Sequence, residues 1–382
     1  MAPFQHKPID LDGRSFRLFR LFKGECGSLE GELFDAWLQD TEGLIEYEAL
    51  SYTWGGSYKP QDVTIDGKLM LVTTNLFRAL QHLRCRNRDR ILWIDAICID
   101  QTNEKERGHQ VQQMTDIYRT AERVLIWLGQ STPETDTVFD HMLQLARDAT
   151  KYACKHWVAS DKRWMEIWSS VQPPSGHAHG DLRAEERKGF EIILRRPWFK
   201  RVWIIQEVAN ARSAQIVCGT KSVSAHIFAV TPALLEVKPP PHYQAILDIM
   251  PGPTRAWSWW NRKHDLHTLL LKFGGSEASD PRDMVYALLG ISSDGGSTDT
   301  LVPDYEKSLR RVIHDTLAFL LRLDNGKCSR PPLPPWTLPD LLQDLESLGN
   351  ATIMWAAKTG QEALWHANAA IIGSRERARG DC

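Results

Sequence analysis

The stretch from Ile91 to Gly129 constrains the fold more strongly than any other part of the sequence. It begins with an apolar run, Ile91 to Ile94, and ends with a second one, Val124 to Leu128. Between them, Asn103 followed three residues later by Glu106 is typical of a capping box at a helix start. Two apolar strands joined by a helix form a βαβ unit, whose strands are parallel and covered on both faces. This stretch therefore predicts an α/β fold with a mainly parallel sheet and flanking helices.

Further strands and helices are expected on both sides of this unit. Alternating apolar and basic residues predict a half-buried strand at Phe16–Phe22, and Glu48–Trp54 predicts a strand that stops at a Gly-Gly pair. The Asp-Gly pair at residues 66–67 predicts a β-hairpin with a two-residue turn, followed by a short helix capped by Thr74. Pro197 suits the first turn of a helix that should run to about Ala211, before a further strand.

Breaks in these patterns divide the chain into three regions. We expect an N-terminal strand region at 1–46, a main α/β domain at 47–220 with an insertion at about 151–188, and a mostly helical C-terminal region at 238–382. In the last region one helix should end at Gly290 and another should begin near Ser308.

Charge and cysteine content exclude several classes of protein. The 46 basic and 48 acidic residues give a net charge of −2 without a block of like charge, which disfavours a nucleic-acid or anionic-membrane binder. No apolar run is long enough to span a membrane and no signal peptide is evident, so we expect a cytoplasmic protein. The seven dispersed cysteines indicate reduced thiols. The pairs Cys154-x-His156 and His177-x-His179 lack the spacing of a zinc site, and no metal is expected.

Three blocks of the sequence resemble the fungal heterokaryon incompatibility (HET) domain. They are EALSYTWG with the preceding Tyr47, the stretch that begins at Leu92, and RRPWFKRVWIIQEVANA from Arg195. The downstream DPRDMVYALLG, from Asp280, looks like the region that follows such domains, whereas the sequence from about Gly326 departs from the family pattern. The resemblance implies a role in non-self recognition and programmed cell death when incompatible fungal cells fuse.

HET domains are also remotely similar to TIR domains, which are flavodoxin-like α/β modules. Some TIR domains hydrolyse NAD at the nicotinamide glycosidic bond, and their essential glutamate belongs to a Trp-x-x-x-Glu motif. In this sequence the motif falls on Trp203 and Glu207. The resemblance therefore implies a TIR-like fold, NAD as a substrate rather than a cofactor, and Glu207 as the catalytic carboxylate.

Several polar residues follow the predicted strands directly. Asp95 ends one strand, and Tyr52, Trp54 and Gly55 lie at the end of another. Ligands of open α/β sheets bind beyond the carboxyl ends of the strands, so these residues are candidates for substrate binding. Two alternatives remain: Asp95 caps the following turn, and the Gly-Gly pair is a plain tight turn rather than a phosphate-binding one.

Glu207 and Arg107 are the remaining candidates. Glu207 lies four residues after Trp203, so both side chains project from one helix face. A carboxylate there can stabilise an oxocarbenium-like transition state, but it can equally form a structural ion pair with Arg201 or Lys200. Arg107 lies near a helix start, where a cation is unfavourable, so we expect an acidic partner or a ligand phosphate beside it.

The resulting hypothesis is a HET-class cell-death effector that hydrolyses NAD with Glu207, while Trp203, Asp95 and Tyr52 shape the pocket. Self-association is expected by analogy with TIR-like enzymes. The alternatives are a non-catalytic signalling module that recruits protein partners, and an inactive paralogue.

Overall fold

A computed structural model describes residues 1–38, 45–151, 157–171, 178–262, 264–295 and 301–320. The chain divides into two compact units, Met1–Lys263 and His264–Cys382. The first unit extends past the boundary expected at the proline run, because Pro241 begins helix α9 within it.

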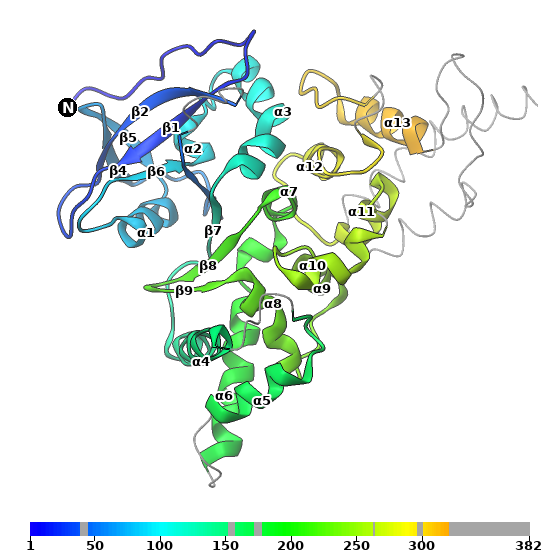
Figure 1. Cartoon of the computed structure of the whole chain (residues 1–382). Helices are drawn as coiled ribbons and strands as arrows, with labels where there is room; N and C mark the ends of the chain where they lie inside the picture. The colour runs from blue at the N-terminus through cyan, green and yellow to red at the C-terminus, as the bar shows by residue number, and fades with distance from the viewer. Residues whose placement is uncertain (39–44, 152–156, 172–177, 263, 296–300, 321–382) are drawn as a thin grey trace, which may run out of the picture. The chain divides into compact units, whose positions relative to one another are not determined.

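One sheet organises the described part of the first unit (Figure 1). Its nine strands follow the order β5-β4-β2-β1-β6-β3-β7-β8-β9 among the described residues. The strands are β1 (Ser15–Leu21), β2 (Glu30–Trp37), β3 (Glu48–Tyr52), β4 (Gln61–Ile65), β5 (Lys68–Val72), β6 (Arg90–Trp93), β7 (Arg123–Trp127), β8 (Ala214–Cys218) and β9 (Lys221–Ser224).

The centre of this sheet, β6-β3-β7-β8, is parallel, and this confirms the predicted α/β fold. Antiparallel strands flank it: β9 pairs with β8, and β1 pairs with β6 on one side and β2 on the other. The strands upstream of residue 47 therefore belong to the same sheet as the predicted main domain. The β4–β5 hairpin has positive φ at Asp66 and Gly67, as the expected two-residue turn requires.

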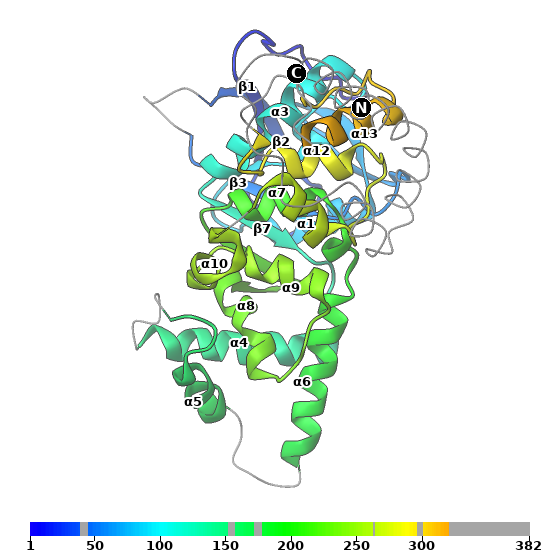
Figure 2. The same ribbon diagram turned by 90° about the vertical axis from the view of Figure 1, so that its right-hand side faces the viewer.

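Helices cover the sheet and extend beyond its β9 edge. The described helices of this unit are α1 (Thr74–Leu83), α2 (Asp95–Cys98), α3 (Glu104–Thr120), α4 (Pro133–Thr150), α5 (Lys162–Val171), α6 (Ala178–Leu194), η2 (Pro197–Lys200), α7 (Trp203–Asn210), α8 (Ala225–Leu234), α9 (Pro241–Asp248), α10 (Pro253–Trp257) and η3 (Trp259–Asn261). The expected insertion corresponds to α5 and α6, which pack against α4 away from the centre of the sheet (Figure 2). The loop expected near residues 173–181 lies mostly outside the described residues.

Two local predictions need correction. The cap of α1 is Thr73, whose hydroxyl accepts a hydrogen bond from the amide of Leu76, and Thr74 is the first helical residue. The single helix expected from Pro197 to about Ala211 is wrong, because Arg201 adopts an extended conformation that separates η2 from α7. This break directs the Arg201 side chain back towards the end of β3, where it bonds the carbonyl of Tyr52.

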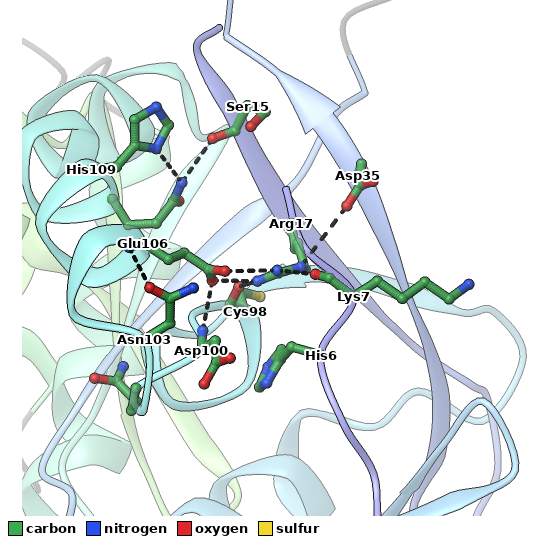
Figure 3. Close-up of polar contacts among 12 residues, drawn as sticks. His6, Lys7, Ser15, Arg17, Asp35, Cys98, Asp100, Asn103, Glu106 and His109 are labelled. Atoms are coloured by element: carbon green, nitrogen blue, oxygen red, sulfur yellow. Dashed lines mark hydrogen bonds and ion pairs between the residues drawn. The ribbon is translucent and has the colours of Figure 1, made fainter. Parts of the chain in front are cut away.

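A buried ion pair joins the N-terminal strand to the start of α3 (Figure 3). Arg17 on β1 and Glu106 on α3 are each 2% exposed, and their charged groups lie 2.5 Å apart. Arg17 also donates to the carbonyl of Cys98, and Glu106 accepts from the amide of Asp100. Asn103 caps α3 as predicted, but the expected reciprocal bond of the capping box is replaced by these contacts, because Glu106 turns inward to Arg17.

The described part of the second unit is helical, with α11 (Leu266–Phe273), α12 (Asp283–Leu289) and α13 (Leu309–Leu320). Arg282 stabilises it through bonds to the Asp280 carboxylate and to the carbonyls of Tyr305 and Lys307. The helix expected to end at Gly290 does so, although with right-handed backbone angles. The atypical sequence from about Gly326 lies outside the described residues. In the part of the chain that is described, no helix is long and apolar enough to cross a membrane.

Candidate functional site

The strands β3 and β6 are parallel neighbours, with Ala49 paired to Trp93, so both run towards the same edge of the sheet. Their terminal residues meet there: the indole N–H of Trp54 donates to a carboxylate oxygen of Asp95 over 2.8 Å. Gly55 and Gly56 follow immediately, exposed to solvent, with φ of +80° and +101° that favour glycine. The structure thus brings together three of the residues predicted from the two strand ends.

Asp95 lies at the turn that follows β6. It is the first residue of α2, and its carboxylate accepts a bond from the amide of Ala96 at 2.7 Å, whereas the cap position of α2 is Ile94. Its second oxygen faces Trp54 and the remaining charged groups of the site. Burial raises the pKa of Asp95, although Arg201 and the bond from Trp54 oppose that rise.

Two buried phenols lie next to these charges. Tyr52, 2% exposed, ends β3, and burial together with the Asp95 carboxylate raises the pKa of its hydroxyl well above the usual value. The Tyr118 hydroxyl, from α3, donates to the carbonyl of Leu50 at 3.2 Å. Burial and the nearby Glu207 raise the pKa of Tyr118 in the same direction. Both phenols therefore stay neutral and contribute polar hydroxyl groups, but no charge, to the site.

Glu207, on α7, lies close to these groups. Together with Tyr52, Asp95, Tyr118 and Arg201 it forms a buried polar cluster. The Glu207 side chain is 2% exposed, and one carboxylate oxygen lies 3.9 Å from a guanidinium nitrogen of Arg201. Burial raises the pKa of Glu207 to about 7, with Asp95 adding to the rise and with Arg201 and a hydrogen bond from Ser51 opposing it. The other oxygen, Oε2, has no hydrogen-bond partner among the described residues. At neutral pH this buried carboxyl is therefore divided between its neutral and ionised forms.

Arg201 is the cation of the cluster. One of its guanidinium nitrogens donates to the carbonyl of Tyr52 and is the same atom that lies 3.9 Å from Glu207. Its side chain is 20% exposed, so it reaches solvent while Glu207 lies beneath the surface. The ion pair expected as the structural alternative for Glu207 is thus present, but its length exceeds that of a hydrogen bond.

Trp198 and Ser51 are buried residues that contact the site through hydrogen bonds. The indole N–H of Trp198, 1% exposed, donates to the Ser51 hydroxyl at 2.8 Å. Because an indole can only donate, the Ser51 hydroxyl must accept here, and its own proton is left for another acceptor such as Glu207. Sequence reasoning missed Trp198, Tyr118 and the place of Arg201 at the centre. The signal for Arg201 was the pair of basic residues, Lys200 and Arg201, that interrupts the apolar pattern between Phe199 and Val202.

The other two candidates, Trp203 and Arg107, lie on α7 and α3, the helices that carry Glu207 and Tyr118. Trp203 is half-buried at the first position of α7, one turn before Glu207. Arg107 is half-buried near the start of α3, the helix that packs against α7 through a bond from Gln206 to Thr115. Their roles in substrate binding stay predictions. Among the described residues, no group of three or more His, Cys, Asp or Glu side chains is arranged to hold a metal ion.

Comparison with known proteins gives two matches. A family model described as "Heterokaryon incompatibility protein (HET)" matches residues 47–207. The chain is also similar to "Heterokaryon incompatibility protein 6, OR allele" of Neurospora crassa, with 29% identity over 338 residues, 74% of this chain and 48% of that protein. The chain thus spans about half the length of that relative. No solved structure gives a significant match. Every residue of the cluster lies within the range matched by the family model.

Proposed function

Because residues 47–207 are a heterokaryon incompatibility (HET) domain, we propose that the chain acts in fungal incompatibility, the process in the name of its Neurospora relative. Within this role we propose that it hydrolyses NAD at the nicotinamide glycosidic bond in the cytoplasm and so contributes to cell death. The observation that carries the proposal is the buried Glu207 carboxyl, with one unpartnered oxygen, beside the ends of two parallel strands.

The reaction needs little besides a well-placed carboxylate. The C1′–N1 bond breaks, its electron pair stays on the nicotinamide nitrogen, and neutral nicotinamide leaves. Water then bonds to C1′ and releases a proton, which yields ADP-ribose. The ionised Glu207 stabilises the positive charge that develops on the ribose ring, and Asp95 and Tyr52 line the same end of the sheet. In this proposal Trp54 and Trp203 offer aromatic faces to the bases, and Gly55 and Arg107 lie on the phosphate side.

The energetic cost of this arrangement also supports a functional role. A carboxyl whose pKa is raised to about 7 destabilises the fold once it is ionised. Structural carboxylates that pair well with arginine are stabilised in their ionised form instead. Strongly perturbed groups clustered at the carboxyl edge of a parallel sheet are characteristic of functional sites.

The burial of Glu207 implies that the described conformation is a resting one. At 2% exposure the carboxyl cannot contact a substrate until a covering side chain moves. Self-association through protein contacts is the trigger we propose, since assembly can stabilise an open conformation that is rare in the isolated chain.

Nicotinamide release from NAD by the purified protein tests the proposal, measured over a range of protein concentrations and after clustering through a dimerising tag. We expect release that Glu207→Gln abolishes. Glu48→Gln is the matched control: Glu48 is also buried and paired with arginine, but it lies at the amino end of β3. Release that survives Glu207→Gln would exclude this site.

The second candidate function is a non-catalytic adaptor. The burial of Glu207 beside Arg201 favours it, since a structural ion pair needs no access to solvent. On this alternative, even clustered protein releases no nicotinamide, and expression of the Glu207→Gln variant in a fungal host still causes the incompatibility response.

A further inference from the structure

Arg201 is the more exposed partner of the Glu207 carboxyl. It lies in the break between η2 and α7, and one guanidinium nitrogen is shared between the carbonyl of Tyr52 and the carboxylate of Glu207. The Arg201 side chain is 20% exposed against 2% for that of Glu207, so an approaching ligand reaches the arginine of this pair before the carboxylate.

The resting contact between Arg201 and Glu207 opposes the proposed chemistry. A carboxylate that stabilises a positively charged transition state is weakened by a guanidinium 3.9 Å away, since the two charges partly cancel. Productive cleavage therefore requires the guanidinium to turn towards another anion. The Oε2 atom of Glu207 is buried and has no hydrogen-bond partner among the described residues, so no bond has to be broken at this atom before it interacts with a ligand.

NAD itself carries the required anion in its pyrophosphate. Guanidinium groups bind phosphates through paired N–H bonds, and they do so more strongly than they bind a carboxylate over 3.9 Å. Room for a phosphate exists nearby: Gly55 and Gly56 follow Tyr52 closely, both are exposed, and nothing lies within 4 Å of the position where a Cβ of Gly56 would be. Arg201 bonds the carbonyl of Tyr52, three residues before Gly55, and the backbone N–H groups of such turns also bind anions.

We propose that Arg201 recognises phosphate in addition to Arg107, and that its transfer from Glu207 to the substrate pyrophosphate restricts cleavage to nicotinamide nucleotides. This inference rests on the proposed NAD hydrolysis and adds its specificity. A nucleoside with the same glycosidic bond but no phosphate, nicotinamide riboside, leaves Arg201 against Glu207 and is a poor substrate.

The test compares kcat/KM for NAD and for nicotinamide riboside in the clustered full-length protein and in Arg201→Gln. We expect the ratio to favour NAD in the wild type and to fall roughly 10- to 100-fold in Arg201→Gln, as for the loss of a charged hydrogen bond. The ratio is the readout because any change in Glu207 ionisation affects both substrates alike. Arg195→Gln is the matched control, since Arg195 belongs to the same segment but is 76% exposed and contacts Glu191.

A binding measurement separates this inference from the activity. ADP-ribose binding, measured by calorimetry, should be strong in the wild type, weaker in Arg201→Lys and lost in Arg201→Gln, whereas adenosine should not distinguish the three. If neither substrate is cleaved but ADP-ribose binding still depends on Arg201, the recognition role stands and the hydrolysis proposal fails. Equal cleavage of both substrates by the wild type, or an unchanged ratio in Arg201→Gln, would overturn the inference. Arg201→Lys, which keeps the charge, replaces Arg201→Gln if the latter does not fold.

Discussion

Replacing Glu207 with glutamine should stabilise the protein at alkaline pH. Burial raises the pKa of this carboxyl from an ordinary value of 4.5 to about 7 in the folded protein. Such a rise corresponds to about 3 kcal/mol of stability lost when the group is ionised, at about 1.4 kcal/mol per pH unit. Glutamine has nearly the same shape as the neutral acid and never ionises, so the variant avoids this loss.

The sign of the pH dependence follows from proton binding. Between pH 4.5 and about 7 the folded protein keeps a proton on Glu207 that the unfolded chain has already released. The stability contributed by this group is therefore complete below pH 4.5 and is lost as the pH rises through about 7. Wild type and Glu207→Gln should differ by less than about 1 kcal/mol at pH 5, and the variant should be the more stable by about 3 kcal/mol at pH 8.

Thermal unfolding followed by tryptophan fluorescence measures this difference, because the first unit holds twelve of the fifteen tryptophans. About 3 kcal/mol in a unit of this size corresponds to a Tm difference of roughly 6–12 °C at pH 8. Glu106→Gln is the control: Glu106 is equally buried, but its close pair with Arg17 is structural, so its loss should destabilise at both pH values. The reasoning would be refuted if Glu207→Gln were also destabilised at pH 8, since Glu207 would then be a structural partner of Arg201.

Three further predictions concern activity and stability. Nicotinamide release should increase as the pH rises through about 7, because the ionised Glu207 is the active form; a rate that falls over this range contradicts the assignment. Arg17→Met should cost about 3–5 kcal/mol in urea unfolding by leaving Glu106 unpaired in the interior. Arg20→Met removes the ion pair between Arg20 and Glu32, which is as short as that of Arg17 but whose side chains are 40% and 38% exposed. Its loss should cost at most about 1 kcal/mol, and similar losses of stability in the Arg17 and Arg20 variants would refute this contrast. Arg282→Ala should destabilise the second unit by about 1–3 kcal/mol and increase its proteolytic cleavage, whereas unchanged cleavage would show that its bonds contribute little.

Local signals in the sequence located most strands of the sheet and placed polar residues directly after two of them. Apolar runs and their end points located the strands β3, β6, β7 and β8, because a fully buried parallel strand tolerates few polar residues. The positions of Asp95 and Trp54 after neighbouring strands then implied that the two side chains would meet. The role of Glu207 was predicted only from the resemblance to HET and TIR domains, and it stays a prediction.

Only the tertiary structure decided what surrounds those residues. Glu106 carried the local signature of a capping box, yet its carboxylate pairs with Arg17, 89 positions earlier in the chain. In the same way, Arg201 contacts Tyr52 from 149 positions away, and the burial of Glu207 depends on how α7 packs on α3. Sequence periodicity reports which face of an element is apolar, because that property is local. Contacts between distant segments decide which charged group lies beside a given carboxyl, and these contacts form only in the folded chain. They therefore also decide whether that carboxyl is neutral or ionised.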